Sequence, residues 1–301
     1  MESPVIEVKI STDGEYIVLS NQSNSLLVID AETTEIVDSV EYLSGTKFGF
    51  IDEKHFYFTG TRDDFSYGAG KIYSLEDNTI TDLGINSIIG GAGNNNGQYI
   101  IYTGSEIAVF NEGEYEAIAK YNRYDQSINI GEGTISELSY INDTDILIAS
   151  RVNKEINVVI FDTANGELKM ETNIDSDISL CKTLYSEGKI YLVTSKETMY
   201  LDRNSDCHII CIDEKGKIVK ENDIEKLPIK EISFNDKYGL VFTNKEKIEV
   251  VDRDSLELRT ELEFMYQNAT DIIETRIVAG TNRIFITYKN GTFQSYTIGN
   301  F

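Results

Sequence analysis

Seven copies of one short pattern run along this chain of 301 residues, and they constrain its fold more than any other feature. Each copy is a turn signal followed by a strand rich in aromatic and β-branched residues, as expected for half-buried strands bounded by turns. The copies are Thr12–Ser20, Asp52–Thr59, Asn96–Thr103, Asn142–Ser150, Glu187–Thr194, Asp236–Thr243 and Thr281–Tyr288. Their strands start 39 to 50 residues apart, which is the spacing of a repeated four-stranded unit.

The rest of each unit supplies three more strands. A second strand ends in an acidic or amide turn and is followed by a third, as in Leu26–Asp30 before Glu35, and Val158–Asp162 before Glu167. One more strand precedes each copy, for example Val5–Ile10. Helical periodicity is missing from these stretches, so the sequence predicts an all-β fold of four-stranded antiparallel units.

These units resemble the YVTN and WD40-like β-propeller repeats of bacteria. The closest matches are Leu240-Val-Phe-Thr-Asn244 and the Asp162-x-x-x-Gly-Glu turn. The resemblance covers essentially the whole chain and implies a seven-bladed β-propeller, although the chain has no Trp and so lacks the Trp-Asp dipeptide of true WD40 repeats. It implies one domain over residues 1–301, with blades at about 5–41, 43–86, 87–128, 129–175, 176–226, 227–268 and 269–301.

The last blade is expected to have three strands, because the sequence ends at Phe301 just after the predicted strand Thr292–Ile298. Met1–Pro4 is too short to pair along a full edge, since each strand residue rises only about 3.3 Å. Two alternatives stay open: a short exposed edge, or an edge that pairs with a strand of a partner.

The charge balance argues against some partners. With 51 acidic and 27 basic side chains, the net charge of −24 repels nucleic acids and anionic membrane surfaces, although it also serves solubility alone. The first ten residues lack an apolar leader, so we expect a cytoplasmic protein, while a chain whose signal peptide had been removed would look the same. Three cysteines are too few for a disulfide framework.

Three long loops predict a binding face. Gly60–Gly70, Tyr121–Thr134 and Ser195–Cys207 fall on one face of the disc that the resemblance implies. Long loops in compact domains are often functional, and Arg and Tyr are enriched at interfaces, although Tyr is abundant throughout this chain. The candidate partner-binding residues are Arg62, Phe65, Tyr67, Tyr121, Arg123, Tyr124, Tyr200 and Arg203.

A second candidate is the central channel that the resemblance implies. Basic residues lie six or seven positions before the predicted second strand of four blades: Lys9, Lys47, Lys182 and Arg276. They form either an anion site or ion pairs with the acidic residues of the same layer, which are Glu137, Glu231 and Glu274.

Metal and cofactor sites are not expected. Asp202–Asp206 begins like a calcium loop, but Cys207 replaces the glycine of the sixth position. Cys207 and Cys211 lie about 13 Å apart in a strand, too far for one zinc ion with His208. We expect His55 to be structural.

The function predicted from these features is a non-enzymatic scaffold that binds a protein or peptide on the loop face. The alternative is a small-molecule enzyme or sensor at the channel, since propeller lactonases and lyases resemble this chain in their repeats. No nucleophile motif or phosphate loop supports an enzyme.

Overall fold

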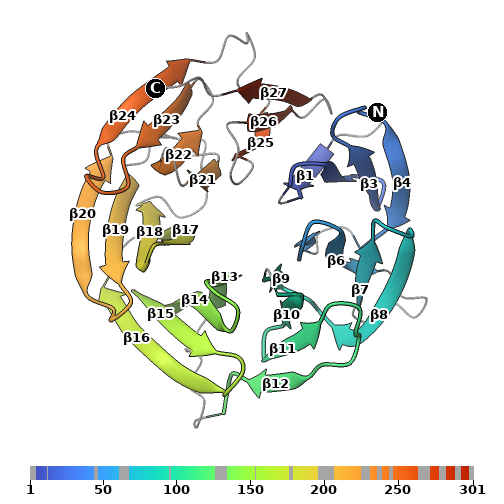
Figure 1. Cartoon of the computed structure of the whole chain (residues 1–301), viewed down its shortest axis with the longest axis horizontal. Helices are drawn as coiled ribbons and strands as arrows, with labels where there is room; N and C mark the ends of the chain where they lie inside the picture. Colours follow the sequence, from blue (N-terminus) through green and yellow to red (C-terminus); the bar gives the residue numbers. More distant parts are fainter. Residues whose placement is uncertain are drawn as a thin grey trace. The chain divides into compact units, whose positions relative to one another are not determined.

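The computed structural model describes most of the chain. The described residues are 5–11, 13–43, 47–60, 68–94, 96–125, 134–152, 154–175, 179–195, 207–224, 231–235, 239–243, 247–263, 272–277, 283–288 and 293–297. Every regular element among them is a β-strand, so the all-β prediction is confirmed. The strands form seven antiparallel sheets, of which six have four strands and the last has three (Figure 1).

Within each sheet, strands that are neighbours in the sheet are also neighbours in the sequence. The first two sheets are β1 (Val5–Ile10), β2 (Tyr16–Asn21), β3 (Ser25–Asp30), β4 (Ile36–Glu41), and β5 (Gly49–Phe50), β6 (His55–Gly60), β7 (Ala69–Ser74), β8 (Thr79–Asn86). The next two are β9 (Gly90–Gly93), β10 (Gln98–Tyr102), β11 (Glu106–Asn111), β12 (Ala119–Asn122), and β13 (Thr134–Tyr140), β14 (Asp145–Val152), β15 (Glu155–Asp162), β16 (Glu167–Asp175).

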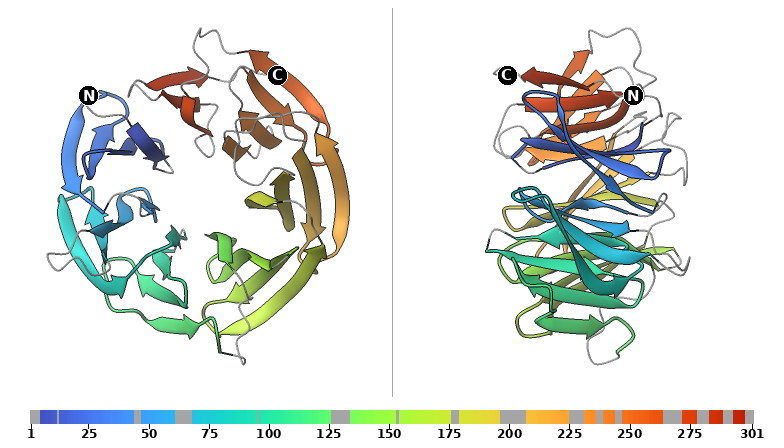
Figure 2. Two further views of the ribbon diagram at one scale, coloured as in Figure 1. Left: turned by 180° about the vertical axis from the view of Figure 1, so that it is seen from behind. Right: turned by 90° about the vertical axis from the view of Figure 1, so that its right-hand side faces the viewer.

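The remaining sheets are β17 (Ser179–Ser186), β18 (Lys189–Ser195), β19 (Cys207–Asp213), β20 (Ile218–Ile224), then β21 (Glu231–Asn235), β22 (Gly239–Thr243), β23 (Lys247–Val251), β24 (Leu258–Glu263), and finally β25 (Ile272–Ile277), β26 (Arg283–Tyr288), β27 (Phe293–Thr297). All seven predicted repeat strands are the second strands of these sheets. In the described part of the chain the last sheet has the three strands that the sequence predicts. The strands of each sheet twist across one another, as the edge-on view in Figure 2 shows.

By its internal contacts the chain divides into two compact units, Lys9–Ile174 and Met1–Val8 with Asp175–Phe301. Within the first unit, the core lies between successive sheets. The second strands β2 and β6 are almost fully buried, whereas β4 and β8 are exposed at most of their positions. Strands covered on both faces need continuous apolar runs, which explains the unbroken hydrophobic stretches in the repeat.

Aromatic side chains join neighbouring sheets in this unit. Phe56 stacks on Tyr73 with ring centroids 4.9 Å apart, and both belong to a cluster with Val18 and Val28 of the first sheet. The Tyr73 hydroxyl donates to Asp38 Oδ2 of β4 at 2.5 Å. Burial raises the pKa of Tyr73 and the carboxylate raises it further, so the hydroxyl stays a donor.

One turn recurs at the end of the third strand. An aspartate there accepts hydrogen bonds from backbone amides two to four residues later, and the turn then reaches a residue with positive φ. The four aspartates are Asp30, Asp162, Asp213 and Asp252. Side chains that bond the backbone in this way stabilise turns independently of the rest of the sequence.

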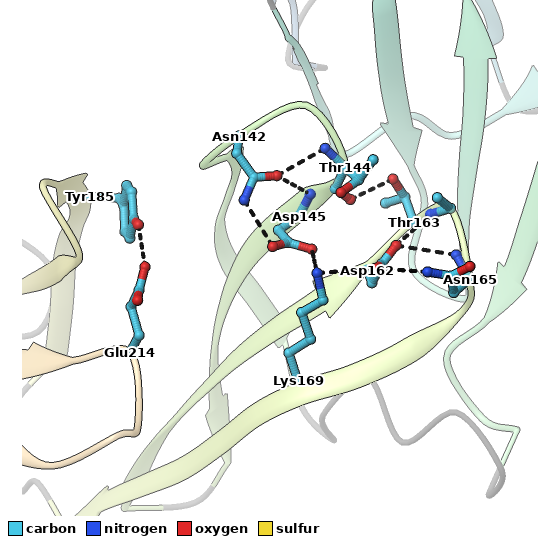
Figure 3. Close-up of polar contacts among 10 residues, drawn as sticks. Asn142, Thr144, Asp145, Asp162, Thr163, Asn165, Lys169, Tyr185 and Glu214 are labelled. Carbon is cyan, nitrogen blue, oxygen red and sulfur yellow. Dashed lines mark hydrogen bonds and ion pairs between the residues drawn. The ribbon is translucent and has the colours of Figure 1, made fainter.

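The fourth sheet shows how such a turn is tied to its strands. Lys169 Nζ of β16 lies 2.5 Å from Asp145 Oδ1 and 3.0 Å from Asp162 Oδ2 (Figure 3). Asn142 donates to the other oxygen of Asp145 at 2.8 Å. Lys169 therefore bridges Asp145 and Asp162, which are cross-strand partners at one end of the β14–β15 pair.

A close approach of two backbones requires glycine in β9. A Cβ atom at Gly93 would lie 1.6 Å from the carbonyl oxygen of Ile51, which belongs to the second sheet. No side chain fits there, so the innermost strand of the third sheet is built from glycine and alanine.

Candidate functional site

The candidate site lies at one end of the sheets of the first unit. In an antiparallel four-stranded sheet, the turn between the second and third strands emerges at the same end as the connections to the neighbouring sheets. We call this the loop-bearing end. The predicted long loops fall in the connections between β6 and β7, between β12 and β13, and between β18 and β19, and their central residues lie outside the described residues.

Among the described residues, Tyr124 is the most exposed large hydrophobic side chain, at 76%. It lies in the connection after β12, where its backbone amide donates to Asn122 Oδ1 at 2.9 Å. Its hydroxyl donates to the Gly104 carbonyl in the β10–β11 turn at 3.4 Å. The backbone and the hydroxyl of Tyr124 are thus each held by one hydrogen bond, while most of the side chain faces solvent.

Arg123 is buried rather than exposed beside Tyr124. Its side chain is buried, at 8% exposure, and Nη1 donates to the same Gly104 carbonyl at 3.2 Å. Its backbone amide donates to the Ser105 carbonyl at 3.0 Å. Burial lowers the pKa of Arg123 although the guanidinium remains a cation. Arg123 therefore fixes the turn that carries Tyr124.

Tyr121 takes part in packing between sheets. Its ring meets Phe161 of the fourth sheet edge-on, with centroids 4.9 Å apart. Its hydroxyl donates to the Thr163 carbonyl at 2.6 Å, and burial raises its pKa. The structure brings Arg123 and Tyr124 together at Gly104, and it directs Tyr121 toward the neighbouring sheet.

Two apolar residues at this end were not selected from the sequence. Leu43 and Ile89 are 37% and 38% exposed, and each follows the outer strand of its sheet. Their backbone amides are fixed to Thr59 O at 2.8 Å and Tyr102 O at 2.9 Å. Ile89 also lies next to Gly104. The signal available in the sequence was a bulky apolar residue close to a boundary between predicted blades.

The other predicted partner-binding residues lie outside the described residues. These are Arg62, Phe65, Tyr67, Tyr200 and Arg203. The calcium-like segment Asp202–Asp206 lies outside them as well.

The predicted channel cations are placed on inner strands or next to them. Lys9 lies in β1, Lys182 in β17 and Arg276 in β25, while Lys47 lies just before β5 and is exposed. Lys9, Lys182 and Glu137 each interact with neighbouring groups, so none of them is a free charge. Convergence of the four cations on one site stays a prediction.

His208 and Cys211 point to different environments, as expected for a strand. His208 Nδ1 lies 2.7 Å from Asp223 Oδ1. Cys211 is buried at 3% exposure, and burial raises the pKa of its thiol. This separation agrees with packing rather than a shared zinc ion.

The seven sheets define the class of protein: this is a β-propeller. No known protein family matches the sequence, and no curated protein matches it, so the YVTN resemblance stays a prediction. The fold is similar to many solved structures. Hydrazine synthase of Kuenenia stuttgartiensis matches with a TM-score of 0.69 at 11% identity, over 99% of this chain and 97% of that chain.

Sqt1 of Saccharomyces cerevisiae matches with a TM-score of 0.67 at 13% identity, over 98% of this chain and 84% of that chain. At such identities the likeness concerns the fold alone. Among the described residues, no helix is long and apolar enough to span a membrane.

Proposed function

We propose that this protein is a non-enzymatic scaffold that binds a protein or peptide at the loop-bearing end of its sheets. The observation that carries the proposal is Tyr124, which is 76% exposed while its hydroxyl donates to the same Gly104 carbonyl as the buried Arg123. A rigid, exposed tyrosine is the kind of residue that dominates binding energy at interfaces. Ile89 adds an apolar contact beside it. We name Ile89, Gly104, Arg123 and Tyr124 the loop patch.

Preorganisation supports this use of the loop patch. Ordering a side chain on binding costs about 0.5–1.5 kcal/mol, and hydrogen bonds that already hold the ring reduce that cost. The chain's net charge of −24 favours partners whose contact surface is basic, because complementary charge accelerates association.

The experiment is photo-crosslinking in lysate of the organism that makes the protein. A photoreactive phenylalanine analogue at position 124 should give a discrete crosslinked protein. The same analogue at position 115 is the matched control, because Tyr115 is also exposed but lies between β11 and β12, at the opposite end of the strands. Equal crosslinking at both positions, or none at 124, would contradict the proposal.

A binding measurement with the captured partner follows. Tyr124→Ala should weaken its affinity at least about tenfold, the loss expected for an interface anchor. The melting temperature should change by no more than about 2 °C, since an exposed substitution costs little stability. Tyr115→Ala should leave the affinity unchanged.

A further inference from the structure

A second cluster of functional groups lies at the opposite end of the strands, between the second and third sheets. Asp52 and His55 belong to the β5–β6 turn, and Glu112 follows β11. Each residue offers one ligand atom, and these atoms all lie within 4.8 Å of one another. The cluster therefore combines one imidazole with carboxylates from two different sheets.

The β5–β6 turn fixes the first two residues. Asp52 Oδ1 accepts hydrogen bonds from the backbone amides of Lys54 and His55, both at 2.7 Å. His55 Nδ1 lies 3.0 Å and 2.9 Å from the two carboxylate oxygens. The histidine side chain is only 14% exposed. Its ring is thus held in one orientation before any ligand arrives.

A cavity opens at the cluster. It is small, is open to solvent, and is lined by Asp52, His55 and Glu112 together with five other residues: Ile51, Ile72, Tyr99, Gly113 and Tyr115. Tyr99 is held by stacking on Phe110, with ring centroids 4.9 Å apart. The three polar groups therefore face one space with partly apolar walls.

The charge around this space favours a cation. Asp52 and Glu112 place two carboxylates beside the His55 ring, and Glu76 is a further acidic group near it. The nearby Lys54 pairs with Glu76. The cluster thus attracts positive charge.

We propose that Asp52, His55 and Glu112 form a binding site for a transition-metal dication, with zinc as the best-matched ion. Imidazole and carboxylate are ordinary zinc ligands, with bonds of about 2.0–2.2 Å, and a water completes three protein ligands. Tetrahedral zinc ligands lie about 3.3 Å apart. The ligand atoms lie up to 4.8 Å apart, which exceeds the spacing of zinc ligands. Because Glu112 is exposed and has a long side chain, rotation of that side chain brings its carboxylate closer to Asp52 and His55. The nitrogen ligand favours zinc over calcium or magnesium.

The site would join two sheets. Asp52 and His55 come from the second sheet and Glu112 from the third, so a shared ion links their turns. A ligand that binds only the folded state raises its stability.

The test is zinc binding to the chelator-treated full chain, followed by calorimetry and by NMR of ¹⁵N-labelled histidine. The chain has two histidines, so two side-chain signals report separately on His55 and His208. We expect one equivalent of zinc to shift the His55 signal, with His208 unchanged. His208 also contacts acidic groups, so a shift confined to His208 would overturn the proposal.

Glu112→Gln is the decisive variant, because Glu112 is exposed and its loss leaves the β5–β6 turn intact. It should weaken zinc binding at least about tenfold, since changes even to groups behind the ligands cost that much. Glu53→Gln removes the same charge from the exposed middle of the turn and should bind zinc as the parent does. Equal losses of zinc affinity in both variants would show a diffuse charge effect and refute the site. Tighter binding of calcium than of zinc would also refute it.

Discussion

At the scale of single residues, the fold depends on positions where no substitution fits. Gly93 is the clearest example, because its Cα faces the Ile51 carbonyl of the neighbouring sheet. A glycine-rich segment gives no apolar or β-branched signal, and Gly90–Gly93 is weakly marked as a strand in the sequence. Its role becomes visible only once the second sheet is in place.

Gly93→Ala should lower the free energy of unfolding by about 2–4 kcal/mol, because the new methyl group must displace a backbone carbonyl. Gly104→Ala is the matched control: a Cβ there would meet only Ile89, at 3.9 Å. Chemical denaturation of both variants checks this. A Gly93 variant as stable as the Gly104 variant would show that the two backbones can separate freely.

The sequence predicted the exposure of one residue of the candidate sites but not the burial or the proximity of others, for physical reasons. Tyr124 was selected because a long loop with aromatic residues is typical of an interface, and it is exposed. Arg123 was expected beside it, yet it is buried on Gly104, since a single sequence does not reveal which charge a turn will cover. Glu112 and His55 are distant in the chain, so their proximity depended on sheet packing that no local pattern contains.

At the scale of the element, the second and third strands were predicted well and the first strands less well. Middle strands are buried on both faces, so their apolar runs are continuous and easily recognised. β5 has only two residues, Gly49 and Phe50. Such a short strand is held by its neighbours rather than by its own composition.

The fourth sheet carries a pH-dependent element, the bridge from Lys169 to Asp145 and Asp162. Burial raises the pKa of Asp162, but hydrogen bonds from Lys169, Ala164 and Asn165 outweigh it, and the net pKa is lowered. A carboxyl group whose pKa is lowered on folding stabilises the native state above its unfolded pKa of about 3.9. That contribution is lost as the pH falls through the lowered native pKa.

Asp162→Asn should therefore lower the free energy of unfolding by about 1–3 kcal/mol at pH 7. The difference in stability from the parent should shrink as the pH falls toward about 3 and below. Urea unfolding at pH 7, 5 and 3 measures it. Glu167→Gln, an exposed carboxylate on the same sheet, should show little effect at any of these pH values. A constant difference across the pH range would mean that the ionised carboxylate is not what stabilises the turn.

At the scale of the whole molecule, the core clusters of the described residues in the first unit are shared between neighbouring sheets. The buried clusters combine residues of the first and second sheets, of the second and third, and of the third and fourth. Neighbouring sheets should therefore open together, because each supplies one wall of the other's core.

Phe56→Leu tests this coupling, since Phe56 packs against Val18 and Val28 of the first sheet. The substitution should lower the free energy of unfolding by about 1–2 kcal/mol. It should also speed amide hydrogen exchange in both sheets, that is, in β2 and β3 as well as in β6 and β7. β14 and β15, which do not contact Phe56, serve as the internal control. Faster exchange confined to the second sheet would show that the sheets open independently.

The aspartate turn after the third strand has a consequence for how such a chain can change over time. One carboxylate and a few backbone amides define the turn, and Thr34 and Leu256 adopt positive φ where another copy has Gly166. A unit specified by so little can be duplicated and then altered at nearly every other position. The copies would keep their geometry long after their sequences had ceased to resemble one another.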